Sequence, residues 1–478
     1  MKLLQLLKAI FFVLTGSLLL LRPTLTFAQP SKEDMKTGSI ASSRVVPIGW
    51  SKFKSGPCAL PAGQRFGRIV LNVNKYALNT WWQVKKLNQP ALDGYLSFDG
   101  KGEPDIRSAA SEAQALAISL RLGLYNSQVT GVSKEEAEKK TIELIRSLVH
   151  RHLANSVNGW GSVWQSPLWA ASTCMAGWLM WDQLDVQTRK ETVKMLESEA
   201  VWVMSNKGKP VIKTYRDRSG RIISPGDTGS EENAWDSDLL VAATAMLPGD
   251  VNYSRWMNKV IELELATFSR PSDVERTDVY NGKPLSEWLY GSNANEDGTL
   301  INHKIVHPDY MTSGLFEFTP IGFYGLAHQA VPKAGLFNCD VIYNTLANLR
   351  FTAGETINGK PTLPPGGTMM IADSAEIYYP QGNDWGTSRR LNFAMADAVT
   401  ALFSKVPELR RQAAKLEQKH TEYALHMQAR FRDGRTYDAP SEDRFSGREE
   451  WIAEYGSRAY LIHWLAEKQV VTFTNKKY

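Results

Sequence analysis

The sequence predicts an all-α protein, an α/α toroid of about 10–12 helices with no β-sandwich domain. From about Ile106 onward, apolar residues recur at helical spacing and strand-like alternation is rare. The helical segments also alternate between charged, amphipathic ones and apolar ones rich in small residues. Repeated hairpins of one solvent-facing and one buried helix would build an inner barrel wrapped by an outer layer. A bundle or a solenoid is the alternative, but no repeat of fixed period favours the solenoid.

The predicted helices share apolar positions three or four residues apart. Segments 133–154 and 409–432 are charged and need one wet face, whereas stretches 109–120 and 239–246 are apolar enough for burial on nearly all sides. The predicted helices are 69–86, 106–125, 133–154, 167–184, 186–205, 231–246, 253–268, 312–329, 337–351, 387–403, 409–432 and 448–466.

The first residues have the three parts of a signal peptide. Lys2 and Lys8 make the start basic, residues 10–21 are almost entirely apolar, and Thr26-Phe27-Ala28 ends in small residues. The apolar run is short for a membrane span, which needs ~20 residues, so an uncleaved anchor is the less favoured alternative. We therefore expect cleavage after Ala28 and a secreted or periplasmic protein.

The remaining chain divides into an extended lead-in, 29–65, and an α/α-toroid catalytic domain, 66–478. Without the leader the charges nearly balance, and no long basic run is present, so we expect no nucleic-acid partner. No second apolar stretch could cross a membrane, and we expect a monomer without membrane contact after cleavage. Cys58, Cys174 and Cys339 are too few for a disulfide framework, although one disulfide is possible.

Segments that enter the apolar helices mix Trp or Tyr with amides, carboxylates and glycine. In a toroid these segments would lie on one rim, where aromatic rings can stack on sugars and polar groups can bond hydroxyls. Any single Trp is as well explained by core packing, but the clustering favours a polysaccharide or oligosaccharide substrate. At least two of Trp160, Trp164, Trp235 and Trp385 should line the cleft with a ring face exposed. The predicted substrate-binding residues are Trp160, Trp164, Gln165, Trp235, Glu232, His307, Tyr379, Gln381, Asn383, Trp385 and Arg389.

The segment 302–310 has the densest chemistry, because it holds two of the eight histidines of the chain together with an Asn and a Tyr. A metal site is the first possibility to test. His303 and His307 have helical spacing, but Pro308 disfavours a helical conformation at His307. No Glu stands where a zinc hydrolase would use one. We therefore expect neither a metal site nor a cofactor, and histidines that serve only the structure are the remaining alternative.

Two motifs carry a family resemblance. Asn233-x-Trp235-Asp236 at a helix start and Asp297-Gly298-Thr299-x-x-x-His303 with a downstream Tyr resemble the chondroitin AC and hyaluronan lyases and the wider heparinase-type α/α-toroid lyases. The resemblance implies that Asn233 neutralises a uronate carboxylate and that His303 and Tyr310 handle protons. This chain has Thr299 where the family has Ser, a shorter gap between His303 and Tyr310, and no β-sandwich after the toroid.

The implied reaction is β-elimination. Neutralising the uronate carboxylate stabilises the enolate-like transition state formed when the C5 proton leaves. Tyr310 or His303 would remove that proton, and Tyr310 would return one to the leaving oxygen. Asn302 and Asn233 would neutralise the carboxylate, and Arg389 would hold it bidentately.

Two other functions are compatible with the sequence. An inverting glycoside hydrolase needs two carboxylates about 6.5–9.5 Å apart, for which Glu232 or Asp236 could pair with Asp384. The neighbouring Glu231 is predicted to be structural, because Thr228-Gly-Ser-Glu231 matches a capping box. A non-catalytic glycan-binding or envelope-assembly protein would keep the aromatic rim without a working acid/base pair.

Overall fold

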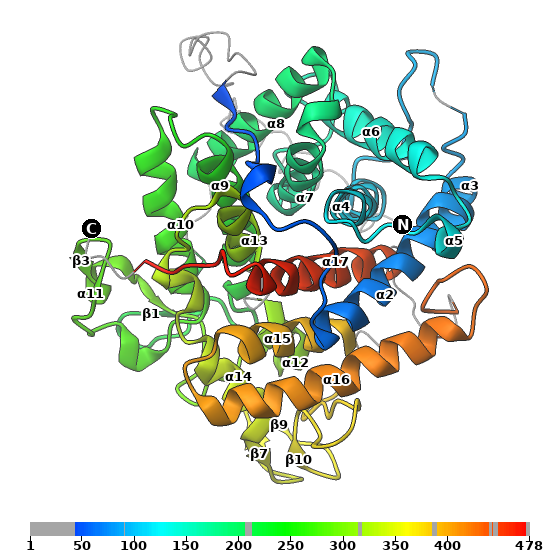
Figure 1. Ribbon diagram of the computed structural model, residues 1–478. Helices are drawn as coiled ribbons and strands as arrows, with labels where there is room; N and C mark the ends of the chain where they lie inside the picture. Colours follow the sequence, from blue (N-terminus) through cyan, green and yellow to red (C-terminus); the bar gives the residue numbers. More distant parts are fainter. Residues whose placement is uncertain are drawn as a thin grey trace, which may run out of the picture. The chain divides into compact units, whose positions relative to one another are not determined.

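The computed structural model describes residues 44–89, 91–205, 213–313, 318–384, 390–438, 442 and 448–474 (Figure 1). The predicted signal peptide and the lead-in up to residue 43 lie outside the described residues. The described chain is mostly helical, and its few strands are two residues long, which confirms the all-α class. The described residues form no barrel or sandwich of strands, and the toroid stays a prediction.

The helices follow the predicted segments closely. The prediction for α8 matches residue for residue, whereas the predicted segment 312–329 is two helices, α12 and α13. No helix in the described part of the chain is both long and apolar enough to cross a membrane. The helices are α2 (Pro61–Tyr76), α3 (Trp82–Val84), α4 (Ser108–Arg121), α5 (Ser127–Thr130), α6 (Lys134–His150), α7 (Ser166–Leu179), α8 (Val186–Ser205), α9 (Ser230–Met246), α10 (Tyr253–Thr267), α11 (Leu285–Trp288), α12 (Pro308–Ser313), α13 (Phe318–Ala327), α14 (Cys339–Asn348), α15 (Arg390–Phe403), α16 (Pro407–Ala429) and α17 (Arg448–Glu467).

The first helix begins earlier than predicted. Pro61 stands at the first position of α2, where its missing N–H costs no helical hydrogen bond. Phe66, Ile69, Val70 and Val73 are buried along one face of α2. The lead-in therefore ends at Leu60 rather than at residue 65, because the proline starts the helix before its apolar face begins.

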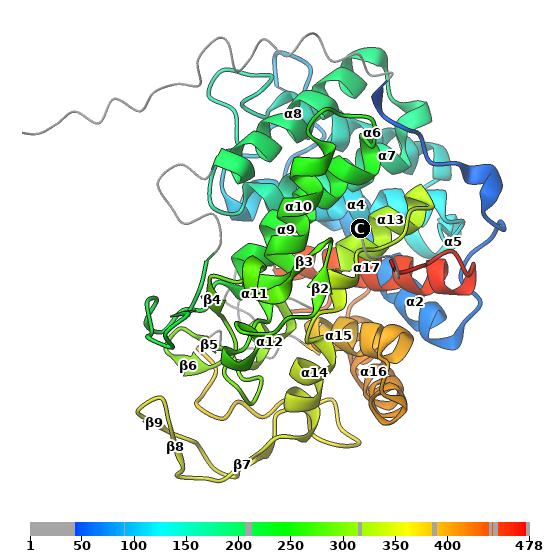
Figure 2. The same ribbon diagram turned by 90° about the vertical axis from the view of Figure 1, so that its left-hand side faces the viewer.

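The strands make five antiparallel pairs, all in the part of the chain between α8 and α15. Figure 2 shows β4 to β9 in the lower left part of the view, away from α6 and α8. The β5–β6 hairpin carries the candidate site. The pairs are β1 (Arg216–Asp217) with β4 (Gly291–Ser292), β2 (Val279–Tyr280) with β3 (Lys283–Pro284), β5 (Ile301–Asn302) with β6 (Ile305–Val306), β7 (Arg350–Phe351) with β10 (Gly367–Thr368), and β8 (Thr356–Ile357) with β9 (Lys360–Pro361).

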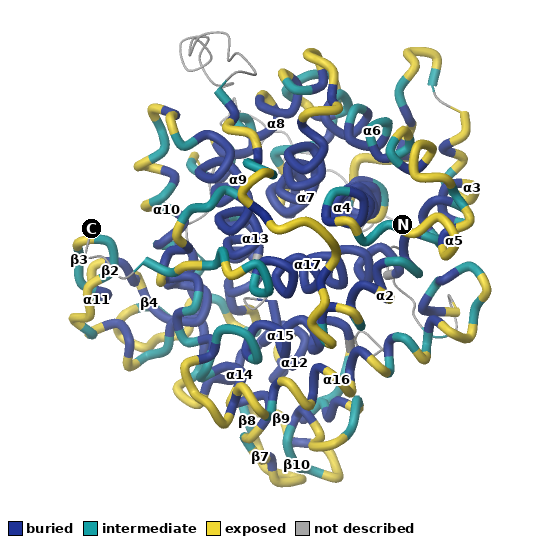
Figure 3. The backbone as a smooth tube through the Cα atoms, in the orientation of Figure 1, coloured by how far each residue is buried: buried dark blue, intermediate teal, exposed yellow. Residues whose placement is uncertain are grey.

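The apolar helices contact one another in a closed series. α4 contacts α7, α7 contacts α9, α9 contacts α13, α13 contacts α17, and α17 contacts α4. Every residue of α7 is buried, and only one residue of α9 is not, as expected for helices rich in small apolar residues. The more charged α6, α8 and α10 lie against this series on α4, α7 and α9. Figure 3 shows the buried helices in the middle of the view and most of the exposed residues toward its edges, apart from an exposed stretch that crosses the middle of the view.

A buried ion network joins three helices of the series. Arg458 of α17 contacts Asp238 of α9 at 3.2 Å and Glu454 at 3.5 Å. Glu454 in turn contacts Arg107, next to the start of α4, at 3.1 Å. Burial raises the pKa of Asp238 to about 7, although the Arg458 guanidinium lowers it. Glu264 of α10 adds a second buried carboxyl beside Asp238.

We predict that Asp238→Asn flattens the pH dependence of stability. Unfolded Asp has a pKa near 3.9, so between about pH 4 and pH 7 the folded protein holds a proton that the unfolded chain has lost. The free energy of unfolding therefore falls as pH rises through this window. From pH 5 to pH 8 the wild type should lose ~2 kcal/mol more than the variant, measured by urea unfolding. Parallel pH profiles of the two proteins would contradict the prediction.

All three cysteines are buried, and none of them forms a disulfide. The disulfide that the composition allowed is therefore not formed. Burial raises the pKa of Cys58 to about 12 and also raises that of Cys174, so both are thiols at neutral pH. Packing, rather than a covalent bridge, stabilises the fold.

Candidate active site

A pocket of about 490 Å³ opens where the entry to α9 meets the β5–β6 hairpin. Its volume lies in the range typical of small-molecule sites. Five predicted site residues line it, and five further residues complete the wall. The lining residues are Trp164, Glu232, Asn302, His303 and Tyr310, with Pro225, Gly226, Asp227, Glu231 and Lys304.

The β5–β6 hairpin places His303 in a tight turn. His303 and Lys304 are its two central residues, with φ of 50° and 66°, the signature of a type I′ turn. Asn302 Oδ1 accepts a hydrogen bond from the His303 N–H at 2.8 Å. The Lys304 N–H donates to the Gly226 carbonyl at 2.9 Å, which ties the turn to the loop before α9. Left-handed backbone at two non-glycine residues costs free energy and is typical of functional sites.

The site contains a continuous chain of hydrogen-bonded groups. Tyr310 Oη lies 3.1 Å from His303 Nε2. The Asp384 carboxylate accepts from His303 Nδ1 at 2.5 Å and from His307 Nε2 at 2.9 Å. These bonds, that from His307 first, hold the pKa of Asp384 well below its usual range. An ionised Asp384 fixes the proton of a neutral His303 on Nδ1, which leaves Nε2 to accept from the Tyr310 hydroxyl.

The segment before Asp384 is held by residues that the sequence assigned to the substrate. Tyr379 Oη donates to Asp309 Oδ2 at 2.9 Å. Gln381 Oε1 accepts from the Val306 N–H at 2.8 Å, and its Nε2 donates to two backbone carbonyls of the β8–β9 hairpin. Tyr379 and Gln381 thus position Asp384 against the β5–β6 hairpin. Asn383 lies half-buried in the same segment and is not among the pocket residues.

Glu232 is one of two buried carboxylates of the pocket, beside Glu231. Its Oε1 accepts from Trp164 Nε1 at 3.2 Å and is paired with the Lys213 ammonium. Burial raises the pKa of Glu232, and the Lys213 charge opposes that shift. Glu232 is therefore a candidate general acid, because it lines the pocket and its pKa is raised.

The predicted capping box at the start of α9 is wrong. The N-cap is Gly229, with no side-chain cap, so Thr228 lies one residue too early to cap the helix. The Thr228 N–H donates instead to the Ile301 carbonyl of β5. Glu231, predicted to be structural, lines the pocket.

Asn233 is placed differently from the role that the resemblance implied. Its amide accepts from the Lys213 N–H at 3.1 Å and donates to the Lys213 carbonyl at 3.0 Å. Asn233 is buried and is not among the pocket residues, so it holds the backbone at Lys213 rather than a substrate carboxylate. Asp236, one turn after Glu232, is half-buried and also outside the pocket. Asn302 is the predicted amide that lines it.

The tryptophans of the rim segments divide between core and pocket. Trp164 is 51% exposed, and its ring meets the edge of Trp235 with centroids 5.4 Å apart. Trp235 is buried beneath it. Trp160 and Gln165 are buried as well, and Trp160 Nε1 donates to the Leu148 carbonyl, so their assignment to substrate contact needs correction. The cause is the tight packing at the start of α7, which leaves Trp164 as the exposed one of the three described rim tryptophans.

Two predicted residues, Trp385 and Arg389, lie outside the described residues. Lys304, which the sequence did not single out, adds a cation to the pocket wall. Lys213 is not among the pocket residues but is paired with Glu232 of the wall. The position of Lys304 inside the densest motif was a usable signal, whereas nothing in the sequence around Lys213 indicated its place.

We predict that Trp164→Ala weakens glycan binding by about fivefold, since one aromatic stacking contact is worth about 1 kcal/mol. Binding would be measured by calorimetry with a polysaccharide that the wild type binds. Trp50→Ala, at a half-buried tryptophan outside the pocket, is the matched control and should leave affinity unchanged. Equal affinities for the two variants would show that Trp164 is not a platform for the glycan.

One buried amide fixes the elements around the pocket. Asn293 Oδ1 accepts from the Tyr215 N–H at 3.0 Å and the Gly229 N–H at 2.9 Å. Its Nδ2 donates to the Lys213 and Ala266 carbonyls, both at 2.9 Å. Asn293 is fully buried and uses both donors and two acceptor sites. It joins the segment at Lys213 before β1, the start of α9 and the end of α10.

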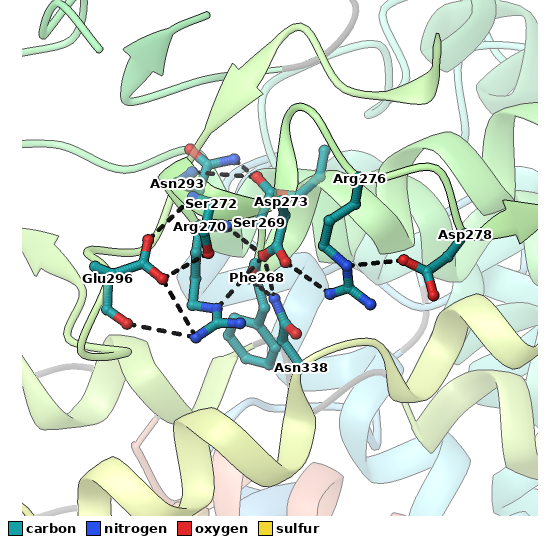
Figure 4. Close-up of polar contacts among 11 residues, drawn as sticks. Phe268, Ser269, Arg270, Ser272, Asp273, Arg276, Asp278, Asn293, Glu296 and Asn338 are labelled. Carbon is teal, nitrogen blue, oxygen red and sulfur yellow. Dashed lines mark hydrogen bonds and ion pairs between the residues drawn. The ribbon is translucent and has the colours of Figure 1, made fainter. Parts of the chain in front are cut away.

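Figure 4 shows the polar cluster beside Asn293. Its centre is the buried Asp273, which accepts from the Arg270 N–H at 2.8 Å, from Arg276 Nη1 at 2.8 Å and from Asn338 Nδ2 at 2.7 Å. The backbone N–H of Asn293 donates to the Ser269 carbonyl at 2.9 Å, and Ser269 lies in the same loop as Asp273. This network holds the segment after α10 against α14.

A larger hollow of about 1510 Å³ lies between α10, the β2–β3 hairpin and the start of α14. None of the predicted site residues that the structure describes lines it. Its wall mixes apolar side chains such as Met257 and Phe337 with scattered charges such as Lys333. The smaller pocket is the better candidate, because the hydrogen-bonded chain of Tyr310, His303 and Asp384 reaches its wall.

Comparisons of the chain with models of protein families, with curated proteins and with solved structures find no match. The likeness to toroid lyases therefore rests on the two motifs alone, and function is argued from the site.

Proposed function

We propose that the protein is an exported polysaccharide lyase that cleaves a uronic-acid-containing glycan by β-elimination on an α/α-toroid scaffold. The observation that carries the proposal is a hydrogen-bonded chain that begins with Tyr310 and His303 on the pocket wall and continues to Asp384 behind them. It supplies a phenol and an imidazole within one proton-transfer distance, with a carboxylate to orient the imidazole. The closed series of helix contacts supports the toroid.

The reaction can be written on these groups. The Tyr310 oxygen takes the C5 proton of the uronate as its own proton passes to His303 Nε2. The C5–H electrons form the C4–C5 double bond, and the C4–O bond breaks. Tyr310 then gives the captured proton to the leaving oxygen and recovers its first proton from His303. Asp384 stabilises the transient imidazolium.

Charge neutralisation would come from Asn302 and Lys304. Asn302 Oδ1 accepts from the backbone of His303, so its NH₂ group is the part left to donate to a substrate. Lys304 lines the same pocket, and no ion pair is formed by its ammonium among the described residues. An amide and a cation beside the reacting uronate stabilise the enolate-like transition state.

The deciding experiment is a screen of acidic and neutral polysaccharides in which ultraviolet absorbance and reducing ends are followed together. A lyase produces both signals, because each cleavage creates an unsaturated uronate and a reducing end. Reducing ends without new absorbance would contradict the lyase proposal and favour the hydrolase. Binding without turnover on any glycan would favour a glycan-binding protein.

The inverting hydrolase stays the second candidate because of one observation. Glu232 lines the pocket, and burial raises its pKa, as expected for a general acid that must be protonated near neutral pH. Asp384 would then be the general base. The lyase is preferred, because Glu232 is engaged by Lys213 whereas the Tyr310 hydroxyl already contacts its partner base.

A further inference from the structure

Three side chains of the site form a cluster suited to a metal ion. His303, His307 and Asp384 each offer one ligand atom, and these atoms all lie within 4.8 Å of one another. We propose that the three residues bind one divalent transition-metal cation of the Zn²⁺ class. Imidazole and carboxylate ligands suit such a cation, and three protein ligands leave a fourth position for water or a substrate oxygen.

The geometry needs little change to accept the cation. Asp384 already bridges both imidazoles, with Oδ2 2.5 Å from His303 Nδ1 and Oδ1 2.9 Å from His307 Nε2. One cation would replace the two protons that now lie between the Asp384 carboxylate and the imidazoles of His303 and His307. Metal–ligand bonds of about 2.0–2.2 Å place tetrahedral ligands about 3.4 Å apart, so the carboxylate withdraws slightly and the imidazoles approach each other.

The outer layer of contacts is the second observation. A metal-bound histidine usually donates its other ring N–H to an oxygen acceptor. His303 Nε2 lies 3.1 Å from Tyr310 Oη, and His307 Nδ1 lies 3.8 Å from Asp309 Oδ2. His307 and Asp309 are completely buried, and Tyr379 fixes the Asp309 carboxylate. Tyr310 thus orients the His303 imidazole toward the shared point, whereas His307 Nδ1 has no hydrogen-bond partner and only faces the buried Asp309 carboxylate.

From the sequence we expected no metal, because Pro308 disfavours the helical conformation that would bring His303 and His307 together and because no Glu stands where a zinc hydrolase would use one. His303 is on a hairpin turn instead, and His307 directly precedes α12. The third ligand, Asp384, comes from a segment 77 residues after His307. The objection from Pro308 therefore applies to a helical site and not to this one.

The test is metal binding by the full mature chain after treatment with a chelator. Competition with a chromogenic indicator should show one Zn²⁺ per chain, and Co²⁺ should give the intense visible absorption of a low-coordinate site. His307→Gln and Asp384→Asn should each weaken Zn²⁺ binding by at least about 100-fold, more than the loss of an outer-layer partner. His426→Gln, at an exposed histidine of α16, is the matched control and should bind like the wild type.

The proposal is overturned if the wild type binds no Zn²⁺, or if either ligand variant binds as tightly as the control. If His307→Gln disturbs folding, Asp384→Asn still tests the proposal, because the Asp384 side chain is 47% exposed. Circular dichroism can confirm that the Asp384→Asn variant is folded.

One consequence rests on the proposed function. The cation would engage His303 and Asp384, so Zn²⁺ should inhibit the lyase and a chelator should restore it. Zn²⁺ binding at these residues without inhibition would support the site and contradict the proton-transfer role of His303.

Discussion

Replacing Tyr310 by Phe should abolish turnover and leave glycan binding nearly intact. The ring would still pack between the imidazoles of His303 and His307, whose centroids lie 5.2 and 4.8 Å away. The change removes only the hydroxyl that lies 3.1 Å from His303 Nε2. Losing a general acid or base typically costs ~10²–10⁴-fold in rate, so kcat should fall by that factor.

The measurement is kcat and KM on a polysaccharide that the wild type cleaves, with unsaturated product followed by absorbance. Tyr290→Phe is the matched control, because Tyr290 is 62% exposed and lies outside the pocket. It should keep the wild-type rate. A near-normal Tyr310→Phe enzyme beside an inactive Asp384→Asn enzyme would contradict the lyase and favour the hydrolase. If neither change matters, the active site lies elsewhere.

Replacing Asn293 should have the largest effect on stability. Asn293→Ala would leave the buried Gly229 N–H without its partner. It would also remove one hydrogen bond each from the Tyr215 N–H and from the Lys213 and Ala266 carbonyls, which keep bonds to Ser292, Asn233 and Ser269. An unsatisfied buried N–H costs about 1–3 kcal/mol and each of the three other lost hydrogen bonds about 0.5–1.5 kcal/mol, so the free energy of unfolding should fall by about 3 kcal/mol. The measurement is urea unfolding of the wild type and the variant.

Asn293→Asp is the sharper form of this experiment. It preserves size and the Oδ1 acceptor but turns the donor toward Lys213 and Ala266 into a second acceptor. It should therefore destabilise about as much as Asn293→Ala. The control is Asn281→Asp on the turn between β2 and β3, where the side chain bonds Asn258 near the surface. A loss below about 0.5 kcal/mol in both Asn293 variants would refute the anchoring role, since that is the usual range for surface changes.

The sequence predicted the helices because their signal is local. Each needs only apolar residues at helical spacing, which is why α8 (Val186–Ser205) was found in full. The helix start predicted from apolar spacing was wrong for α2, because Pro61 starts this helix before its apolar face begins. Short strands such as β5 were not foreseen, because two residues show no alternation. His303 and Tyr310 could be proposed together because seven residues separate them.

Partners distant in the sequence were decided by the tertiary structure. Asp384 was named as a carboxylate from its own segment, but its contact with His303 joins residues 81 apart. Nothing in the sequence indicated the four hydrogen bonds of Asn293. Nor did it indicate that Asn233 bonds the backbone of Lys213 instead of lining the pocket. Trp160 entered the core and Trp164 stayed exposed, although both stand in one motif.

The physical reason is the same in each case. A helix is specified by side-chain periodicity within one segment, so the sequence by itself determined the all-α class and most helix positions. The partner of a polar side chain depends on which buried donors and acceptors other segments leave unpaired, and that is known only once the segments are packed. The sequence thus supplied the groups of the candidate site, and the tertiary structure decided which of them meet.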